Sequence, residues 1–120
     1  MNRNLASQLR KRLLSLRRQR SKIEEEILAL REHLRASLLK RYLSAGGKRR
    51  QSPAHYLCVR RSDGRNQFIY VRKANLARVK SQVEAHKRYR ECLSRLRTVN
   101  KEILNAFKSL GDSLEVEVRS

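Results

Sequence analysis

The apolar positions in the first third of the chain repeat with helical spacing. They follow one another in steps of four and three residues, and Arg20 takes the one place in the series that is not apolar. This spacing is the heptad signature of a helix that packs along one stripe. It predicts a long helix over residues 5–43, ended by Ala45, Gly46 and Gly47, because glycine accepts the left-handed conformation common past a helix C-terminus. The apolar positions are Leu9, Leu13, Leu16, Ile23, Ile27, Leu30 and Leu34.

The segment that follows, residues 44–73, changes from helical spacing to a hairpin pattern. Two runs rich in β-forming residues, 56–60 and 67–71, flank a polar stretch with Asp63 and Gly64 at its centre. An Asp-Gly pair in a two-residue loop favours a hairpin, because the preferred turn needs positive φ at both central positions. The register that this loop predicts pairs Leu57 with Tyr70, Val59 with Phe68, Cys58 with Ile69 and Tyr56 with Val71.

Helical spacing returns over residues 75–110. The spacing slips between His86 and Tyr89, as a local insertion of three residues would cause. Gly111 is the predicted end of this helix. Residues 111–120 form a tail, whose alternation at 114–118 is too short to predict a strand. The predicted seam of this second helix is Leu76, Val79, Val83, His86, Tyr89, Leu93, Leu96, Asn100, Ile103, Phe107 and Leu110.

These elements predict a mainly α fold and a single domain, 1–120. Its two long antiparallel helices would form a coiled-coil hairpin with a β-hairpin at the tip. In that arrangement Arg20 and Asn100 lie at similar heights and form a polar layer that fixes the register. A lone two-stranded hairpin is marginal in water, and this one is apolar on both faces. We therefore expect further cover from a second copy of the chain, the favoured choice, or from a larger protein partner.

The charge of the chain narrows the range of expected functions. Thirty Lys and Arg stand against 11 Asp and Glu, which gives a formal net charge of +19 and a pI near 11.3. So basic a chain repels itself unless an anion lies beside it, and a pI above about 9 is typical of nucleic-acid binding. No acidic residue occurs in residues 1–22 or 33–62. The predicted contacts are Lys48, Arg49, Arg50, Arg60, Arg61, Arg65 and Arg72 around the β-tip, and Arg10, Lys11, Arg12, Arg17 and Arg18 near the N-terminus.

The expected chemistry of these residues is phosphate neutralisation. Each Lys or Arg that meets a phosphate releases condensed counterions, so affinity should fall steeply with salt. Arginine predominates, and its planar fork suits bidentate contacts to phosphate or guanine. Tyr56 and Tyr70 could stack on an unpaired base; the alternative is that both pack within the hairpin.

Nothing in the pattern favours an enzyme, a cofactor or a metal. The three histidines fall in different segments, and consecutive Glu24, Glu25 and Glu26 fan around a helix instead of converging on one point. Gly46-Gly47-Lys48 lacks the spacing of a phosphate-binding P-loop. Cys58 and Cys92 stand far apart and are interpreted as reduced thiols in a cytoplasmic setting. No run approaches the roughly 20 apolar residues of a membrane span, so no membrane partner is expected.

Several stretches together carry a family resemblance. They are Ser37-Leu-Leu-Lys-Arg-Tyr-Leu, a basic Gly-containing loop, Pro53-Ala-His-Tyr-Leu, the strand end at Tyr70 to Lys73, and a long helix. Over roughly residues 35–110 the chain resembles a small uncharacterised prokaryotic helix/β-hairpin/helix family, often encoded beside transposases and other mobile-element genes. The family turn commonly carries several cysteines suggestive of metal. Here that stretch is Ala45-Gly-Gly-Lys-Arg-Arg-Gln, so basic residues stand where thiolates would be.

The hypothesis from the sequence is a non-catalytic nucleic-acid-binding accessory protein of a transposition or other nucleoprotein complex. DNA and RNA are both open as ligands. One alternative is a coiled-coil protein–protein adaptor or oligomerisation module. A ribosome-associated basic protein is the other.

Overall fold

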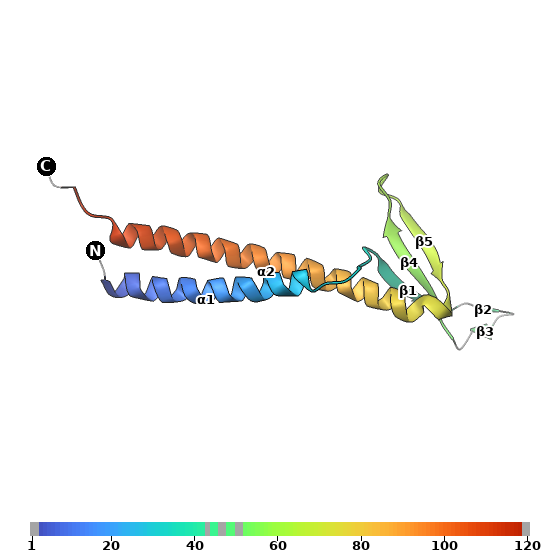
Figure 1. Cartoon of the computed structure of the whole chain (residues 1–120). Coiled ribbons are helices and arrows are strands. Elements are labelled where there is room, and N and C mark those ends of the chain that lie inside the picture. The colour runs from blue at the N-terminus through green and yellow to red at the C-terminus, as the bar shows by residue number, and fades with distance from the viewer. Residues whose placement is uncertain (1–2, 43, 46–47, 50–51, 119–120) are drawn as a thin grey trace. The chain divides into compact units, whose positions relative to one another are not determined.

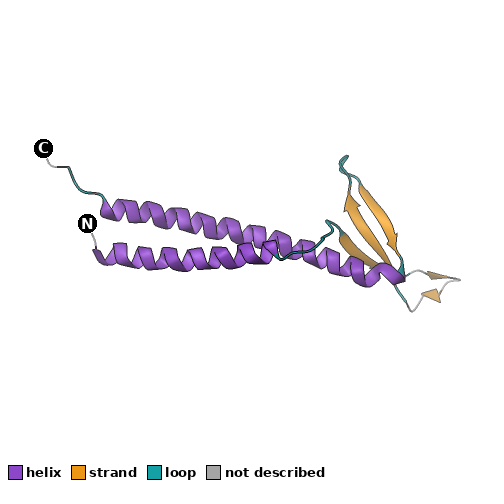
Figure 2. Ribbon diagram, viewed as in Figure 1, coloured by secondary structure: helices purple, strands orange, loops and turns teal. Residues whose placement is uncertain are grey.

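The computed structural model describes residues 3–42, 44–45, 48–49 and 52–118, with the backbone alone at 44–45 and 48–49 (Figure 1). It is mainly helical, with two helices and a three-stranded antiparallel sheet (Figure 2). The elements are α1 (Arg3–Leu28), β1 (Ser37–Arg41), β2 (Ser44–Ala45), β3 (Lys48–Arg49), β4 (Ala54–Arg60), β5 (Asn66–Val71), a 3₁₀ turn (Lys73–Asn75) and α2 (Leu76–Leu114). No helix in the described part of the chain is long and apolar enough to cross a membrane.

The chain divides into two compact units, and the single domain stays a prediction. The helical unit comprises Met1–Ala29 and Arg90–Ser120, so it holds α1 and the later part of α2. The sheet unit comprises Leu30–Tyr89 and holds the five strands of the described residues and the first part of α2. Each unit has its own apolar cluster.

The apolar cluster of the helical unit draws on both helices. Leu13, Leu16 and Ile23 of α1 pack with residues of α2, in agreement with the predicted stripe of the first helix. Two ion pairs join the helices: Arg12–Glu102, with 3.6 Å between the charged atoms, and Arg95–Glu26, with 3.3 Å. Figure 1 shows α1 (blue) lying alongside the later part of α2 (orange to red). The α2 members of the cluster are Cys92, Val99, Ile103 and Ala106, with Leu96 and Leu110 partly buried.

The predicted seam of α2 is partly wrong in this unit. Val99 is buried where Asn100 was expected, and Phe107 is 52% exposed beside a buried Ala106. The predicted polar layer is therefore absent: Asn100 is exposed, and Arg20 pairs with Glu24 of its own helix at 3.5 Å. For Ala106, as for the buried Cys92 beside Leu93, the reason is side-chain size. A prediction from hydrophobicity favours the larger apolar residue, whereas closely packed helices also bury small ones such as alanine and cysteine.

The prediction of one helix over residues 5–43 is wrong beyond Leu28. α1 ends there, and residues 37–41 form strand β1 instead. Tertiary contacts hold the intervening segment on α2. Among them, the Leu34 amide donates to the Gln82 carbonyl at 3.0 Å, and the His33 ring stacks on Tyr89 at 4.8 Å between centroids. Pairing of β1 along the edge of β4 then outweighs the local helical pattern, since helix propensity is a weak prior.

The main sheet has the strand order β1-β4-β5, antiparallel throughout. Leu57 of β4 and Val71 of β5 are buried against Val79 and Val83 of α2. Leu34, Ala36, Leu38, Val59 and Leu76 pack partly buried around them. Because side chains alternate between the faces of a strand, this cluster covers one face of the sheet. We call the opposite side the outer face.

The β4–β5 hairpin forms as predicted, but its register differs by one residue. Leu57 pairs with Ile69, and Tyr56 pairs with Tyr70. The loop holds three residues instead of two. The Gly64 amide donates to the Arg61 carbonyl at 3.0 Å, and the Arg61 amide donates to the Arg65 carbonyl at 2.8 Å, so the last pair of the hairpin is Arg61–Arg65. Gly64 has φ +85°, so a tight turn is followed by one left-handed residue, the usual geometry of a three-residue hairpin loop.

Strands β2 and β3 form a second, two-stranded antiparallel sheet in which Ser44 pairs with Arg49 and Ala45 with Lys48. The predicted helix stop at Gly46 and Gly47 lies outside the described residues. At the other end of the chain, α2 continues through Gly111 to Leu114, so this glycine does not end the helix.

The stability of the helical unit should depend on the buried side chain of Leu16. Leu16→Ala removes a side chain that is 2% exposed and leaves a cavity, which costs about 2–5 kcal/mol of unfolding free energy. Leu14→Ala is the matched control: Leu14 is 55% exposed, and its replacement should change stability by about 0.5 kcal/mol or less. Urea unfolding followed by circular dichroism measures both. Equal losses would contradict the assignment of the core.

Two glycine substitutions should act in opposite directions. Gly64→Ala places a Cβ at φ +85°, which should destabilise the hairpin by about 1–2 kcal/mol. Gly111→Ala lies in a helix with open space around the new Cβ, so it should stabilise the end of α2 by roughly 0.5–1 kcal/mol. Amide hydrogen exchange in β4–β5 and in the last turns of α2 reports each effect locally. Faster exchange at the end of α2 in Gly111→Ala would contradict the helical assignment.

Candidate nucleic-acid interface

The outer face of the main sheet is aromatic and open. Tyr56 and Tyr70 are next to the buried Leu57 and Val71 in their strands, and Phe68 lies two residues before Tyr70. By strand alternation all three lie on the side away from the buried cluster. Tyr70 is 59% exposed and Phe68 is 49% exposed. By the same alternation Leu39 of β1 lies on this face, next to Tyr56 in the register. Large aromatic groups that lie together and exposed on a small domain often mark an interaction surface.

Arg41 extends across this face from β1. Its guanidinium carbon lies 5.7 Å from the centroid of the Tyr56 ring and 5.1 Å from that of Phe68. Both distances are within reach of a cation–π contact, in which the cation is attracted to the negative face of the ring. Tyr56 and Tyr70 meet edge to face, with 5.6 Å between centroids. The outer face therefore combines three aromatic rings with a cation held against two of them.

The sheet unit also carries most of the charge. Residues 30–89 contain sixteen of the thirty Lys and Arg but only three of the eleven Asp and Glu, a formal net charge of +13, which leaves +6 for the other 60 residues. Those three acids neutralise little of the sheet: Glu84 pairs with Lys87 at 3.9 Å, Asp63 accepts the Arg65 amide at 2.9 Å, and Glu32 lies outside the strands. Among described residues, no Lys or Arg side chain of β1, β4 or the β4–β5 turn forms an ion pair.

The predicted contact residues of the β-tip fall at several places in the sheet unit. Arg60 ends β4, and Arg61 and Arg65 close the β4–β5 turn, so these three exposed cations gather at one end of the hairpin. Arg72, also exposed, follows β5 at the opposite end. Lys48 and Arg49 form β3, and their side chains are not described. Arg50 lies outside the described residues.

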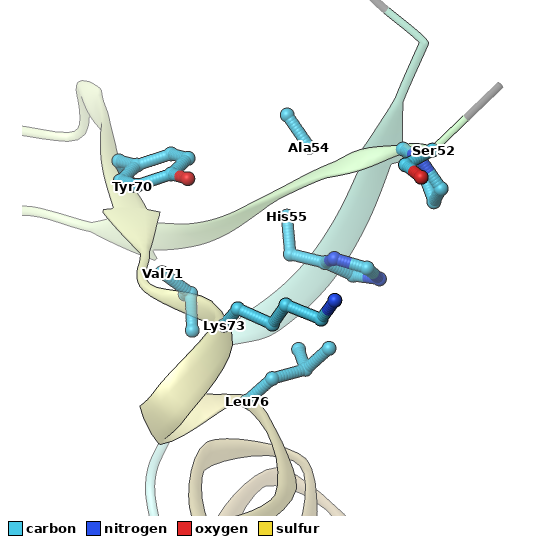
Figure 3. Close-up of a pocket in the computed structure, with 8 residues that line it drawn as sticks. Ser52, Ala54, His55, Tyr70, Val71, Lys73 and Leu76 are labelled. Carbon is cyan, nitrogen blue, oxygen red and sulfur yellow. The ribbon is translucent and has the colours of Figure 1, made fainter. Parts of the chain in front are cut away.

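A shallow pocket of about 380 Å³ opens at the Arg72 end of the sheet (Figure 3). Tyr70 and Val71 of β5, His55 of β4 and Leu76 of α2 line it together with Lys73. Figure 3 shows the His55 ring and the Lys73 side chain lying next to each other, across from the Tyr70 ring. The pocket thus joins an aromatic ring of the outer face to a lysine ammonium that could meet a phosphate.

The second predicted contact zone lies on α1. Arg10, Lys11, Arg12, Arg17 and Arg18 are all exposed. Arg12 is engaged by Glu102, and the other four make no ion pair with a described acid. These cations belong to the helical unit and form a zone of their own.

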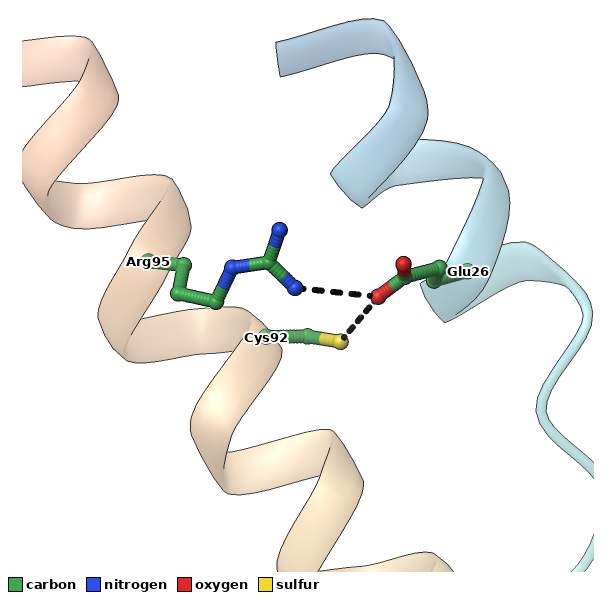
Figure 4. Close-up of polar contacts among 3 residues, drawn as sticks. All are labelled: Glu26, Cys92 and Arg95. Atoms are coloured by element: carbon green, nitrogen blue, oxygen red, sulfur yellow. Dashed lines mark hydrogen bonds and ion pairs between the residues drawn. The ribbon is translucent and has the colours of Figure 1, made fainter. Parts of the chain in front are cut away.

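The polar contact between the helices of that unit is structural in character. Cys92 donates from Sγ to Oε2 of Glu26 at 3.3 Å, and Arg95 binds the same oxygen at 3.3 Å (Figure 4). Burial raises the pKa of the Cys92 thiol, and the hydrogen bond and negative charge of Glu26 raise it further. A neutral thiol is a poor nucleophile.

Within the described residues, no three His, Cys, Asp or Glu side chains are grouped so as to hold a metal ion.

Part of this candidate interface was predictable from the sequence. Tyr56 and Tyr70 were expected as candidate stacking residues, and both lie on the outer face. Phe68 and Arg41 were not expected there. Phe68 alternates with Ile69 and could have been placed by a correct hairpin register, whereas Arg41 could be placed only once residues 37–41 were recognised as a strand.

Comparisons with known proteins identify no relative: no family model, no curated protein and no solved structure matches the chain. The resemblance to the mobile-element-associated family therefore stays a prediction.

The two cysteines should differ in reactivity. Cys92 is buried with a raised pKa, whereas Cys58 is half-buried on the sheet. Iodoacetamide at pH 8 should alkylate Cys58 first in the native protein and both residues at similar rates in urea, as mass spectrometry can follow. Equal alkylation rates of the two cysteines in the native protein would contradict the burial of Cys92.

The raised pKa of Cys92 also makes stability depend on pH. Its contribution to stability is present below the pKa of the unfolded thiol and is lost as pH rises through the folded value.

Proposed function

We propose that the protein is a non-catalytic nucleic-acid-binding protein whose main contact surface is the sheet unit. One observation carries the proposal: a unit of 60 residues with a net charge of +13 surrounds an open aromatic face with arginines that form no ion pair with a described acid. Separated cations of this kind destabilise a small domain by mutual repulsion. A polyanion that binds here relieves the repulsion and releases its own counterions.

The chemistry of the cations favours nucleic acid among polyanions. The cations at the turn, Arg60, Arg61 and Arg65, are arginines and not lysines. The planar guanidinium group of arginine can bind two phosphate oxygens at once. They stand at the end of a hairpin that projects rings and guanidinium groups together, a combination suited to bases as well as phosphates. Either DNA or RNA satisfies this chemistry.

The wider role that we propose is an accessory protein of a transposition or other nucleoprotein complex, acting in the cytoplasm. In this proposal the helical unit is a coiled-coil hairpin, and its α1 arginines supply a second, weaker phosphate contact.

One observation favours a second function, a protein–protein adaptor. In the helical unit Leu14, Leu104 and Phe107 are each more than half exposed. Apolar side chains on a two-helix unit are natural contacts for a further helix, supplied by a second copy or another protein. The two functions are compatible, because they use different units.

Charge reversal at the turn should weaken binding more than the same reversal elsewhere. The triple variant Arg60→Glu, Arg61→Glu, Arg65→Glu should lose about tenfold or more in affinity for nucleic acid near 0.1 M salt, and the slope of log affinity against log salt should become shallower by about 2–3. Fluorescence anisotropy over a salt series measures both.

The matched control is Arg97→Glu, Lys101→Glu, Lys108→Glu. It reverses three exposed cations of α2 and changes the net charge by the same amount. This control variant should reduce affinity only by its effect on the electrostatic field of the whole protein. Equal losses in the two variants would reject the turn as a contact site and leave net charge alone as the cause.

A further inference from the structure

We infer that the outer face of the sheet binds unpaired bases of a single strand, which stack on Phe68 and Tyr70. This inference rests on the proposed function and deepens it, because charge alone does not choose between a duplex and a single strand.

The distribution of aromatic residues supports this choice. The chain has six Phe and Tyr and no Trp, and three of the six lie together on one exposed sheet face. Covering that face would bury the apolar area of the rings, yet the residues of α2 in this unit pack on the other side. A planar ligand that tolerates polar surroundings fits such a surface. Nucleobases are ligands of this kind, since every base has a π-face that stacks on an aromatic side chain.

The contact of Arg41 shows how the surface could be occupied. Its guanidinium lies over Tyr56 and Phe68 at 5.7 and 5.1 Å from the ring centroids, with no described acid paired to it. A planar cation thus covers rings that a base would otherwise cover. When a strand binds, the guanidinium is free to turn to a phosphate while a base takes its place, so the aromatic contact is replaced and a charge-assisted hydrogen bond is added.

The cations at the two ends of the hairpin give the strand a path. Arg60, Arg61 and Arg65 stand at the turn end, and Arg72 and Lys73 stand at the other, where the pocket beside Tyr70 opens. A single strand laid along β5 could meet phosphate contacts at both ends with its bases on the rings between them. This is the arrangement of single-strand binders, in which a basic groove tracks the backbone and aromatic side chains stack the bases.

A duplex and a second copy of the chain both fit less well. In a duplex the bases are already stacked on one another, so their faces reach these rings only after unstacking, which costs a few kcal/mol per base. A second copy would bring another unit of charge +13 against the first, and like charges on facing surfaces are repulsive.

The test removes the rings and keeps the net charge. The double variant Phe68→Leu, Tyr70→Leu and the control Tyr70→Phe, which retains the ring, are compared with wild-type protein. Probes are oligothymidylate and oligouridylate of about 12 nucleotides and a DNA duplex of equal length. Both substituted residues are exposed, so the fold should persist, as circular dichroism can verify.

The inference requires a loss confined to single strands. The double variant should bind single strands about tenfold or more weakly and bind the duplex within about twofold of wild type, and Tyr70→Phe should match wild type. Binding of single strands should also quench the tyrosine emission of wild-type protein, which has no Trp.

Three results would overturn it. If the double variant binds single strands as wild type does, the rings do not stack on bases, and the proposed function stands. If wild-type protein sediments as a dimer and the double variant as a monomer, the face is occupied by a second copy. If wild-type protein binds none of the probes, the proposed function fails as well.

Discussion

The packing of Leu57 and Val71 against Val79 and Val83 decides which side of the sheet is covered. Strand alternation then fixes the opposite side: once these residues face α2, Tyr56, Phe68 and Tyr70 must face away from it. Apolar burial contributes about 25 cal/mol per Å², so the inward cluster holds the sheet on its helix although the rings behind it stay exposed. The aromatic outer face is a consequence of how the core is built.

Electrostatics acts on that open face. A net charge of +13 in 60 residues opposes compactness, and few acids of the unit are placed to offset it. The helical unit is different, because Glu26 and Glu102 reach across to cations of the other helix. Exposed ion pairs of this sort are worth about 1 kcal/mol or less each. Because most of these ion pairs lie in the helical unit, the cations of the sheet unit remain available to a ligand.

Much of the fold could be predicted from local pattern, and the failures have physical causes. The stripe through Leu13, Leu16 and Ile23 and the β4–β5 hairpin were predictable because each depends on residues close in sequence. Strand β1 was not, since Leu38 fits a helical stripe as well as a strand and only pairing with β4 decides between them. The hairpin register failed because Asp-Gly suits both two- and three-residue loops. Because β1 was not predicted, the position of Arg41 on the outer face was not predicted either.

The most direct test of the central claim is the salt dependence of binding by the unmodified protein. Protein freed of nucleic acid at high salt is titrated against duplex DNA, single-stranded DNA and structured RNA by fluorescence anisotropy over a salt series. The account predicts affinity that falls steeply and linearly in log–log form, with a slope set by the number of phosphates neutralised, and tighter binding to strands with unpaired bases. Weak binding that is flat with salt for all three ligands would contradict it.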